Sequence, residues 1–263
     1  QRGSVAIVFR ILASTIPTLD SLNFPEVIKD ICKIKEGLIL VTGPTGSGKS
    51  NTMASIINEI NSTREGHILT LEDPIEYIFK HDKCVVNQRE ISQDSKSYAS
   101  ALRAALREDP DVIFIGEMRD NESISIAVTA AETGHLVLST LHTLGAAKTI
   151  DRLIDVFPPH QQQQIRVQVS SALKAVISQR LIPDIDNKGR VAALEIMIVT
   201  PAISNLIREG RVAAITSMIQ TGAAQGMKLL DKSIAELYQQ GRISKESAYE
   251  YCADRELLKR FIG

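Results

Sequence analysis

The stretch Gly43-Pro-Thr-Gly-Ser-Gly-Lys-Ser50 decides how the rest of the sequence is interpreted. It fits the pattern G-x-x-x-x-G-K-[ST], follows the apolar run 37–42 and precedes a segment with helical periodicity. In that context the glycines let the backbone curl until consecutive N–H groups point at phosphate oxygens, and the helix start adds its positive dipole end. The alternative is a glycine-rich turn that matches by chance, and the flanking strand and helix argue against it.

This loop predicts a site for ATP with Mg²⁺. We expect the Lys49 side chain to reach the β- and γ-phosphates and the Ser50 hydroxyl to ligate Mg²⁺. The predicted nucleotide-binding residues are Gly43, Pro44, Thr45, Gly46, Ser47, Gly48, Lys49, Ser50 and Asn51.

Outside the loop, apolar strand candidates alternate with segments of helical period. The expected strands are 37–42, 67–71, 111–116 and 135–140, and the expected helices are 49–61, 97–107 and 123–132. Alternation of this kind predicts an α/β fold in which helices cover a mostly parallel sheet. After residue 199 the pattern changes to four or five short helices, with stops at Gly210, Gly222 to Gly226 and Gly241.

These changes of pattern predict three parts: residues 1–18, a core of residues 19–199, and a helical C-terminal domain of residues 200–263. Residues 4–12 are expected to form a strand and residues 13–18 a linker. Since nothing precedes that strand for it to pair with, we expect the chain to start inside a longer protein.

Composition excludes several classes of partner. The chain has 263 residues, a net charge of −1 and only 4% aromatic residues, so neither nucleic acid nor anionic lipid is favoured as a partner. Its three cysteines form no C-x-x-C pair, which predicts neither disulfides nor a zinc site and favours the reducing cytoplasm. The apolar runs are shorter than the roughly 18 residues of a spanning helix, so any membrane association is expected to go through partners.

Two acidic segments are candidates for the chemistry. Asp111-Val-Ile-Phe-Ile-Gly-Glu117 is an apolar strand that ends in an acid, and we expect Glu117 to hold the metal, polarise the attacking water, or do both. Glu72-Asp-Pro-Ile-Glu76 follows another strand, and Glu72 is the candidate general base there. A solvated carboxylate at a strand end and a plain acidic turn are the respective alternatives.

Histidines and arginines complete the candidate set. His142 and Thr140 lie at the carboxyl end of a predicted strand, where ligands bind in such sheets, whereas His135 at the other end is expected to be structural. Arg103 and Arg107 are expected to share a helix face, which is usually a solvated stripe. Of the arginines 103, 107, 119 and 152, we expect Arg152 to be the one that stabilises phosphoryl charge from a neighbouring subunit.

The four segments 43–50, 72–76, 111–120 and 134–143, in this order, resemble the Walker A, Asp, Walker B and His boxes of the secretion ATPase superfamily. That superfamily drives type II secretion and type IV pili. The resemblance implies hexameric RecA-like ATPases whose nucleotide sites close between subunits, and residues 3–12 would be the last strand of a PAS-like N-terminal domain. It also implies an inner-membrane pilus platform protein as partner and a cytoplasmic location at the membrane's inner face.

Two features separate the branches of that superfamily. The chain lacks the C-x-x-C units typical of the extension and secretion members. Ala202-Ile-Ser-Asn-Leu-Ile-Arg-Glu209 resembles the retraction signature Ala-Ile-Arg-Asn-Leu-Ile-Arg-Glu, with Ser204 in place of the arginine, and the stretches 219–222 and 226–231 also resemble that branch. The resemblance thus implies pilus retraction. The alternatives are a retraction paralogue or secretion ATPase, a nucleic-acid translocase, and a nucleotide-gated scaffold that seldom hydrolyses ATP.

Overall fold

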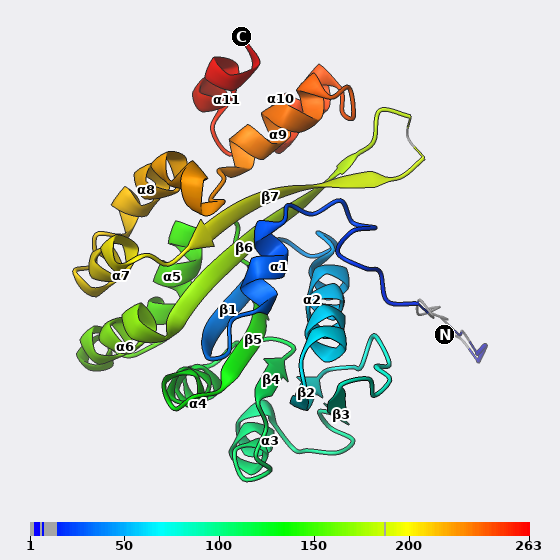
Figure 1. The fold of residues 1–263 in the computed structure, drawn as a ribbon, viewed down its shortest axis with the longest axis vertical. Helices are drawn as coiled ribbons and strands as arrows, with labels where there is room; N and C mark the ends of the chain where they lie inside the picture. The colour runs from blue at the N-terminus through cyan, green and yellow to red at the C-terminus, as the bar shows by residue number, and fades with distance from the viewer. Residues whose placement is uncertain (1–2, 6, 8–14, 187) are drawn as a thin grey trace.

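A single mostly parallel sheet forms the centre of the molecule (Figure 1). The computed structural model describes residues 3–5, 7, 15–186 and 188–263. Within these residues the sheet has seven strands in the order β3-β2-β4-β5-β1-β6-β7, and only β7 runs antiparallel to its neighbour. The strands are β1 (Gly37–Thr42), β2 (Gly66–Glu72), β3 (Cys84–Glu90), β4 (Val112–Ile115), β5 (Leu136–Leu141), β6 (Leu173–Pro183) and β7 (Arg190–Ile198).

Helices cover both faces of this sheet. Those of the first two hundred residues are α1 (Val27–Cys32), α2 (Lys49–Thr63), α3 (Tyr98–Ala105), α4 (Asn121–Glu132), α5 (Ala146–Asp155) and α6 (Pro159–Ala172). The predicted alternation of strands and helices is therefore confirmed. The predicted strand 4–12 lies largely outside the described residues, and its described members 4, 5 and 7 are not in a strand.

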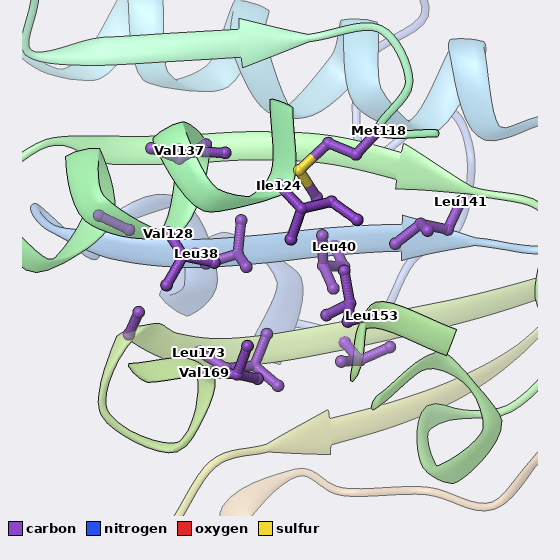
Figure 2. Packing of buried hydrophobic residues seen from close by; sticks show 14 of the residues in the cluster. Leu38, Leu40, Met118, Ile124, Val128, Val137, Leu141, Leu153, Val169 and Leu173 are labelled. Atoms are coloured by element: carbon purple, nitrogen blue, oxygen red, sulfur yellow. The ribbon is translucent and has the colours of Figure 1, made fainter. Parts of the chain in front are cut away.

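Strand β1 is buried from end to end because each of its faces meets a different helix layer. Leu38 and Leu40 pack in one hydrophobic cluster with residues of α4, α5 and α6, as Figure 2 shows. Ile39 and Val41 point to the opposite face and pack with α1 and α2. Full burial of such a side chain contributes roughly 1.5–3 kcal/mol, so the alternation along β1 fixes which helices lie on which side.

Five α-helices follow the sheet, in agreement with the predicted four or five. They are α7 (Pro201–Arg208), α8 (Ile215–Thr221), α9 (Leu230–Gln239), α10 (Lys245–Tyr251) and α11 (Arg255–Ile262). Ile203, Ile207 and Ile215 of α7 and α8 join the same cluster as β1, α5 and α6, whereas Leu230 and Ile234 of α9 pack in a cluster with the outer ends of β6 and β7. None of the helices in the described ranges has the length and apolar character needed to cross a bilayer.

Candidate functional site

The loop between β1 and α2 takes a conformation that only glycine accepts easily. Gly43, Gly46 and Gly48 have φ values of 148°, 78° and 88°. A Cβ atom on Gly43 would lie 2.3 Å from the carbonyl oxygen of Gln179, and one on Gly48 would lie 2.8 Å from the Gln179 side-chain nitrogen. The loop is therefore pressed against β6, with its backbone curled as the sequence predicts.

The side chain of Gln179 on β6 supports this loop through hydrogen bonds. Its Nε2 donates to the carbonyl of Ser47 at 2.7 Å, and its Oε1 accepts from the Thr52 hydroxyl at 2.6 Å. Sequence reasoning missed this residue, because β6 continues directly from α6 without a turn residue and a single glutamine on a strand carries no signal of its own.

The Lys49 ammonium group is hydrogen-bonded to the backbone of the loop itself. Its Nζ donates to the carbonyls of Gly43 and Pro44 at 2.9 and 3.1 Å, and burial lowers its pKa. The hydroxyl of Ser47 is buried and has no hydrogen-bond partner among the described residues. Both groups are thus donors that a phosphate oxygen could satisfy.

One cavity of about 810 Å³ collects the predicted site residues. Such a volume is within the range of ligand pockets. The predicted residues that line it are Thr45, Gly46, Gly48, Lys49, Ser50, Asn51, Glu72, Glu117, Thr140 and His142. The acids therefore share one cavity with the phosphate-binding loop.

Glu117 lies among positively charged and polarisable groups. Its Oε2 accepts from Arg119 at 2.7 Å, and its Oε1 is 3.4 Å from His142 Nε2. Burial by itself favours the neutral carboxyl, but the hydrogen bond from Arg119 and the contact with His142 outweigh it and lower the pKa of Glu117. The carboxylate is therefore ionised at neutral pH and able to bind a cation or accept a proton from water.

Glu72 lies among neutral donors instead. The residue is 7% exposed, and its Oε1 accepts from the Thr70 hydroxyl at 2.6 Å and from Gln88 Nε2 at 3.1 Å. Burial raises the pKa of Glu72, although these hydrogen bonds act in the opposite direction. The contact with Gln88 depends on β3, which the sequence did not reveal.

Gly116 explains why no acid precedes Glu117. A Cβ atom at this position would lie 3.1 Å from the Tyr98 hydroxyl and 3.3 Å from the carbonyl of Leu71. Both contacts are tighter than most Cβ contacts in proteins, so the close approach of Tyr98 and β2 disfavours an aspartate here unless these neighbours shift slightly. The acid is displaced by one residue along the strand.

His142 joins the loop to Glu117. Its Nδ1 is 3.4 Å from both Lys49 Nζ and Thr45 Oγ1, and its Nε2 faces Glu117. His135 directly precedes β5 at its other end; its Nδ1 is 3.1 Å from the carbonyl of Ala130 and 3.5 Å from the hydroxyl of Thr133, and it does not line the cavity. His142 therefore lines the cavity and His135 does not, and a role for His142 at the ligand stays a prediction.

The arginines are distributed differently from the prediction. Arg152 lies on the exposed side of α5 and does not line the cavity, so a role from a neighbouring subunit stays a prediction. Helix α3 ends at Ala105, before Arg107, so the expected shared helix face of Arg103 and Arg107 is wrong. Arg119 and Arg190 line the cavity instead, and Arg190 Nη1 donates to the carbonyl of Gly46 at 3.3 Å.

The residues present fit a magnesium ion shared with phosphates. The described residues contain no group of three or more His, Cys, Asp or Glu side chains that could hold a metal alone. Mg²⁺ usually takes one or two protein ligands and completes its shell with substrate phosphates and water. Ser50 and Glu117 line the same cavity and are suitable oxygen donors for such an ion.

Comparison with known sequences agrees with this geometry. Residues 5–250 match the family described as type II/IV secretion system protein. The chain is 53% identical over 257 residues to a twitching motility protein of Neisseria gonorrhoeae, covering 98% of this chain and 68% of that protein. It is also 53% identical over 250 residues to a type IV pilus retraction ATPase of Pseudomonas aeruginosa, covering 95% of this chain and 72% of that one.

A solved structure has the same fold. The crystal structure of a pilus retraction motor with bound ADP matches at a TM-score of 0.89 and 52% identity, covering 95% of this chain and 71% of that one. The predicted α/β, RecA-like architecture is therefore confirmed, as is the resemblance to the secretion ATPases.

Proposed function

Because this chain belongs to the type II/IV secretion system protein family, we propose that it is the ATP-hydrolysing motor that retracts type IV pili. The observation that carries the proposal is the cavity in which a phosphate-binding loop, two acids and a histidine come together. Nearly the whole chain is similar to retraction motors, which supports pilus disassembly, and hence twitching motility, as the process that the motor drives.

The residues of the cavity divide the hydrolysis of ATP to ADP and phosphate between them. Lys49 would exchange its bonds to the loop carbonyls for bonds to phosphate oxygens, and Ser50 with Glu117 would hold Mg²⁺. When bound, that ion neutralises charge on the β- and γ-phosphates. Glu117, ionised at neutral pH, orients or deprotonates the attacking water, while Glu72 assists from the neighbouring strand.

His142 is suited to report the state of the nucleotide. Its ring is in contact with Lys49, Thr45 and Glu117, all of which change partners when a γ-phosphate is bound or lost. Ordering and release of a segment around a γ-phosphate is a general way to turn local chemistry into domain motion.

The motor is proposed to work as a ring. A homo-hexamer is the assembly that the resemblance to the secretion ATPases implies, and we propose that Arg152, which is exposed on α5, reaches the cavity of a neighbouring copy. We expect it on the cytoplasmic side of the inner membrane, attached through the pilus platform protein, without contact to nucleic acid. We also propose the boundaries 1–18, 19–199 and 200–263 for its three parts.

The test is a chimera in which this chain replaces the matching 250 residues of the Pseudomonas aeruginosa relative. We expect it to release phosphate from ATP with Mg²⁺ but not with a chelator, and to restore twitching to a strain that lacks the relative. A Lys49→Ala chimera is the control that should do neither. Hydrolysis without twitching would contradict retraction and favour another motor of the family, and DNA-stimulated hydrolysis would favour a translocase.

Ser204 makes a retraction paralogue the second candidate. Its hydroxyl donates to the carbonyl of Ser170, so it joins α7 to α6, where the retraction signature has an arginine. If the chain is a retraction paralogue, the chimera with Ser204 does not restore twitching and the Ser204→Arg chimera does. The two chimeras should hydrolyse ATP at the same rate. Equal twitching by both chimeras would exclude it.

A further inference from the structure

Three neighbouring strands present a row of polar side chains beneath the start of α5. Thr42 of β1 pairs in register with Ser178 of β6, and Ser178 pairs in register with Glu195 of β7. Thr42 and Ser178 are fully buried and Glu195 is half-buried, so most of this polar row, Thr42–Ser178–Glu195, lies inside the molecule. Buried polar groups are retained only with partners, and each member of the row has one.

The row holds the beginning of α5. Ser178 Oγ accepts from the backbone N–H of Gly145 at 2.8 Å, and Glu195 Oε1 accepts from that of Ala146 at 2.7 Å. Thr149 of α5 contacts Thr42, which immediately precedes the phosphate-binding loop. Helix α5 begins four residues after His142, so the row fixes the segment that connects His142 to the helix, which we call the His142 loop (residues 142–145).

Glu195 also serves a second helix. Its carboxylate accepts the backbone N–H of Leu230, the first residue of α9. Neither α5 nor α9 has a side-chain cap from its own N-cap residue, Gly145 or Leu229, so one carboxylate caps both helices. The starts of two helices therefore share one half-buried carboxyl group. Burial raises the pKa of Glu195, although the two backbone N–H groups act in the opposite direction.

The position of α9 depends on the same stretch of β7. Lys228 and Ile196 exchange two backbone hydrogen bonds, and Ser233 Oγ accepts from the N–H of Leu194 at 3.1 Å. Glu195 lies between Leu194 and Ile196 and is the member of this stretch that also reaches α5. Leu144 of the His142 loop also packs against the cluster that contains Leu230 and Ile234 of α9, and Glu195 adds the polar contact between the same two regions.

We propose that Glu195 is a positioning residue that couples the His142 loop to α9, so that the nucleotide in the cavity biases the arrangement of the C-terminal helices. The inference rests on the proposed function, because the coupling matters only if ATP binding or hydrolysis changes the His142 loop. Glu195 does not line the cavity and takes no part in the hydrolysis itself.

The variant Glu195→Gln tests this coupling while keeping the size of the side chain. A glutamine carries no negative charge and has an NH₂ group in place of one acceptor oxygen, so the capping of the two helices is weakened. Ser244→Ala is the control: Ser244 caps another C-terminal helix, α10, by accepting the backbone N–H of Ser247 at 3.1 Å, and it lies outside α9.

The readout is amide hydrogen exchange in the first turn of α9, compared between ADP and a slowly hydrolysed ATP analogue. In the parent chain we expect exchange to differ between the two nucleotides, and in Glu195→Gln we expect that difference to disappear. The kcat for ATP should fall by about tenfold with KM within about twofold, the size of a typical coupling between sites. Ser244→Ala should keep both the exchange difference and kcat, even if it lowers the melting temperature as much as Glu195→Gln does.

Three outcomes would overturn the coupling: no nucleotide dependence in the parent chain, an intact dependence in Glu195→Gln, or equal losses in Ser244→Ala. If Glu195→Gln does not fold, Ser178→Ala, which removes the acceptor of the Gly145 N–H, must reduce the same difference. A parent chain that binds nucleotide without hydrolysing it contradicts the proposed function, whereas the exchange measurement still decides the coupling.

Discussion

The carboxyl ends of β2 and β4 lie side by side in the sheet, yet their acids are in opposite surroundings. Glu117 has Arg119 and His142 as partners and a lowered pKa, whereas Glu72 has a hydroxyl and an amide as partners and a raised pKa. Two glutamates that occupy similar positions in the sequence therefore differ in pKa because their neighbours differ, and we expect them to have different roles. Glu117 is kept ionised at the reacting end of the cavity, and Glu72 is held firmly by β3 as a support.

The sharpest way to break this comparison is Glu117→Gln. We expect kcat to fall by about a thousandfold, since the ionised group that orients water is lost, while ATP still binds. Steady-state phosphate release and a nucleotide titration measure the two effects. Turnover close to that of the parent chain would remove Glu117 from its assigned role.

Glu72→Gln should have a smaller effect. A glutamine keeps the acceptor oxygen for Thr70 and Gln88, so we expect a loss of kcat of about tenfold or less. The same assay, run beside Glu117→Gln, decides between the two acids. A loss as large as that of Glu117→Gln would make Glu72 the general base.

The variant Arg119→Ala removes the arginine beside Glu117, so that Glu117, like Glu72, has no cationic arginine partner. Without this cation the pKa of Glu117 rises, so less of it is ionised at acidic pH and the acid limb of the kcat/KM profile moves to higher pH. The control is Arg242→Ala, which removes an ion pair with Asp184 that is remote from the cavity. An unmoved acid limb would show that Arg119 does not set the charge of Glu117.

The smallest expected effect is on stability. Glu117 has a lowered pKa in the folded state, so its contribution is present above its ordinary value of 4.5 and is lost as the pH falls through the folded pKa. Glu72 has a raised pKa, so its contribution is present below 4.5 and is lost as the pH rises through the folded pKa.

The two glutamine variants should therefore change the pH dependence in opposite senses. Relative to the parent chain, Glu117→Gln becomes less stable as the pH rises from acid and Glu72→Gln becomes more stable, each by roughly 1 kcal/mol or less. Urea unfolding at a series of pH values measures both. Slopes of the same sign would contradict the contrast between the two acids.

Local signals were sufficient for the phosphate-binding loop and for the acids and histidine at the strand ends. A glycine pattern between a strand and a helix depends only on residues that are adjacent in the sequence. Parallel strands place their carboxyl ends at one edge of the sheet, so the residues that follow them are expected to lie close together. The sequence was insufficient for β3, an edge strand whose second half, Asn87–Glu90, is polar, and for β6, which follows α6 without a turn residue. Gln88 and Gln179, the supports of Glu72 and of the loop, lie on these two strands.

By itself, the sequence determined the class of fold, the phosphate-binding loop and the acids near it, because each depends on spacing along a few residues. Only the tertiary structure decided that Arg119 accompanies Glu117, that Arg152 lies outside the cavity, and that Glu195 caps two helices separated by more than seventy residues of chain. These facts depend on which strands become neighbours and on what is buried between them. The pKa of a carboxyl and the partner of a buried charge are set by that packing, which no local pattern contains.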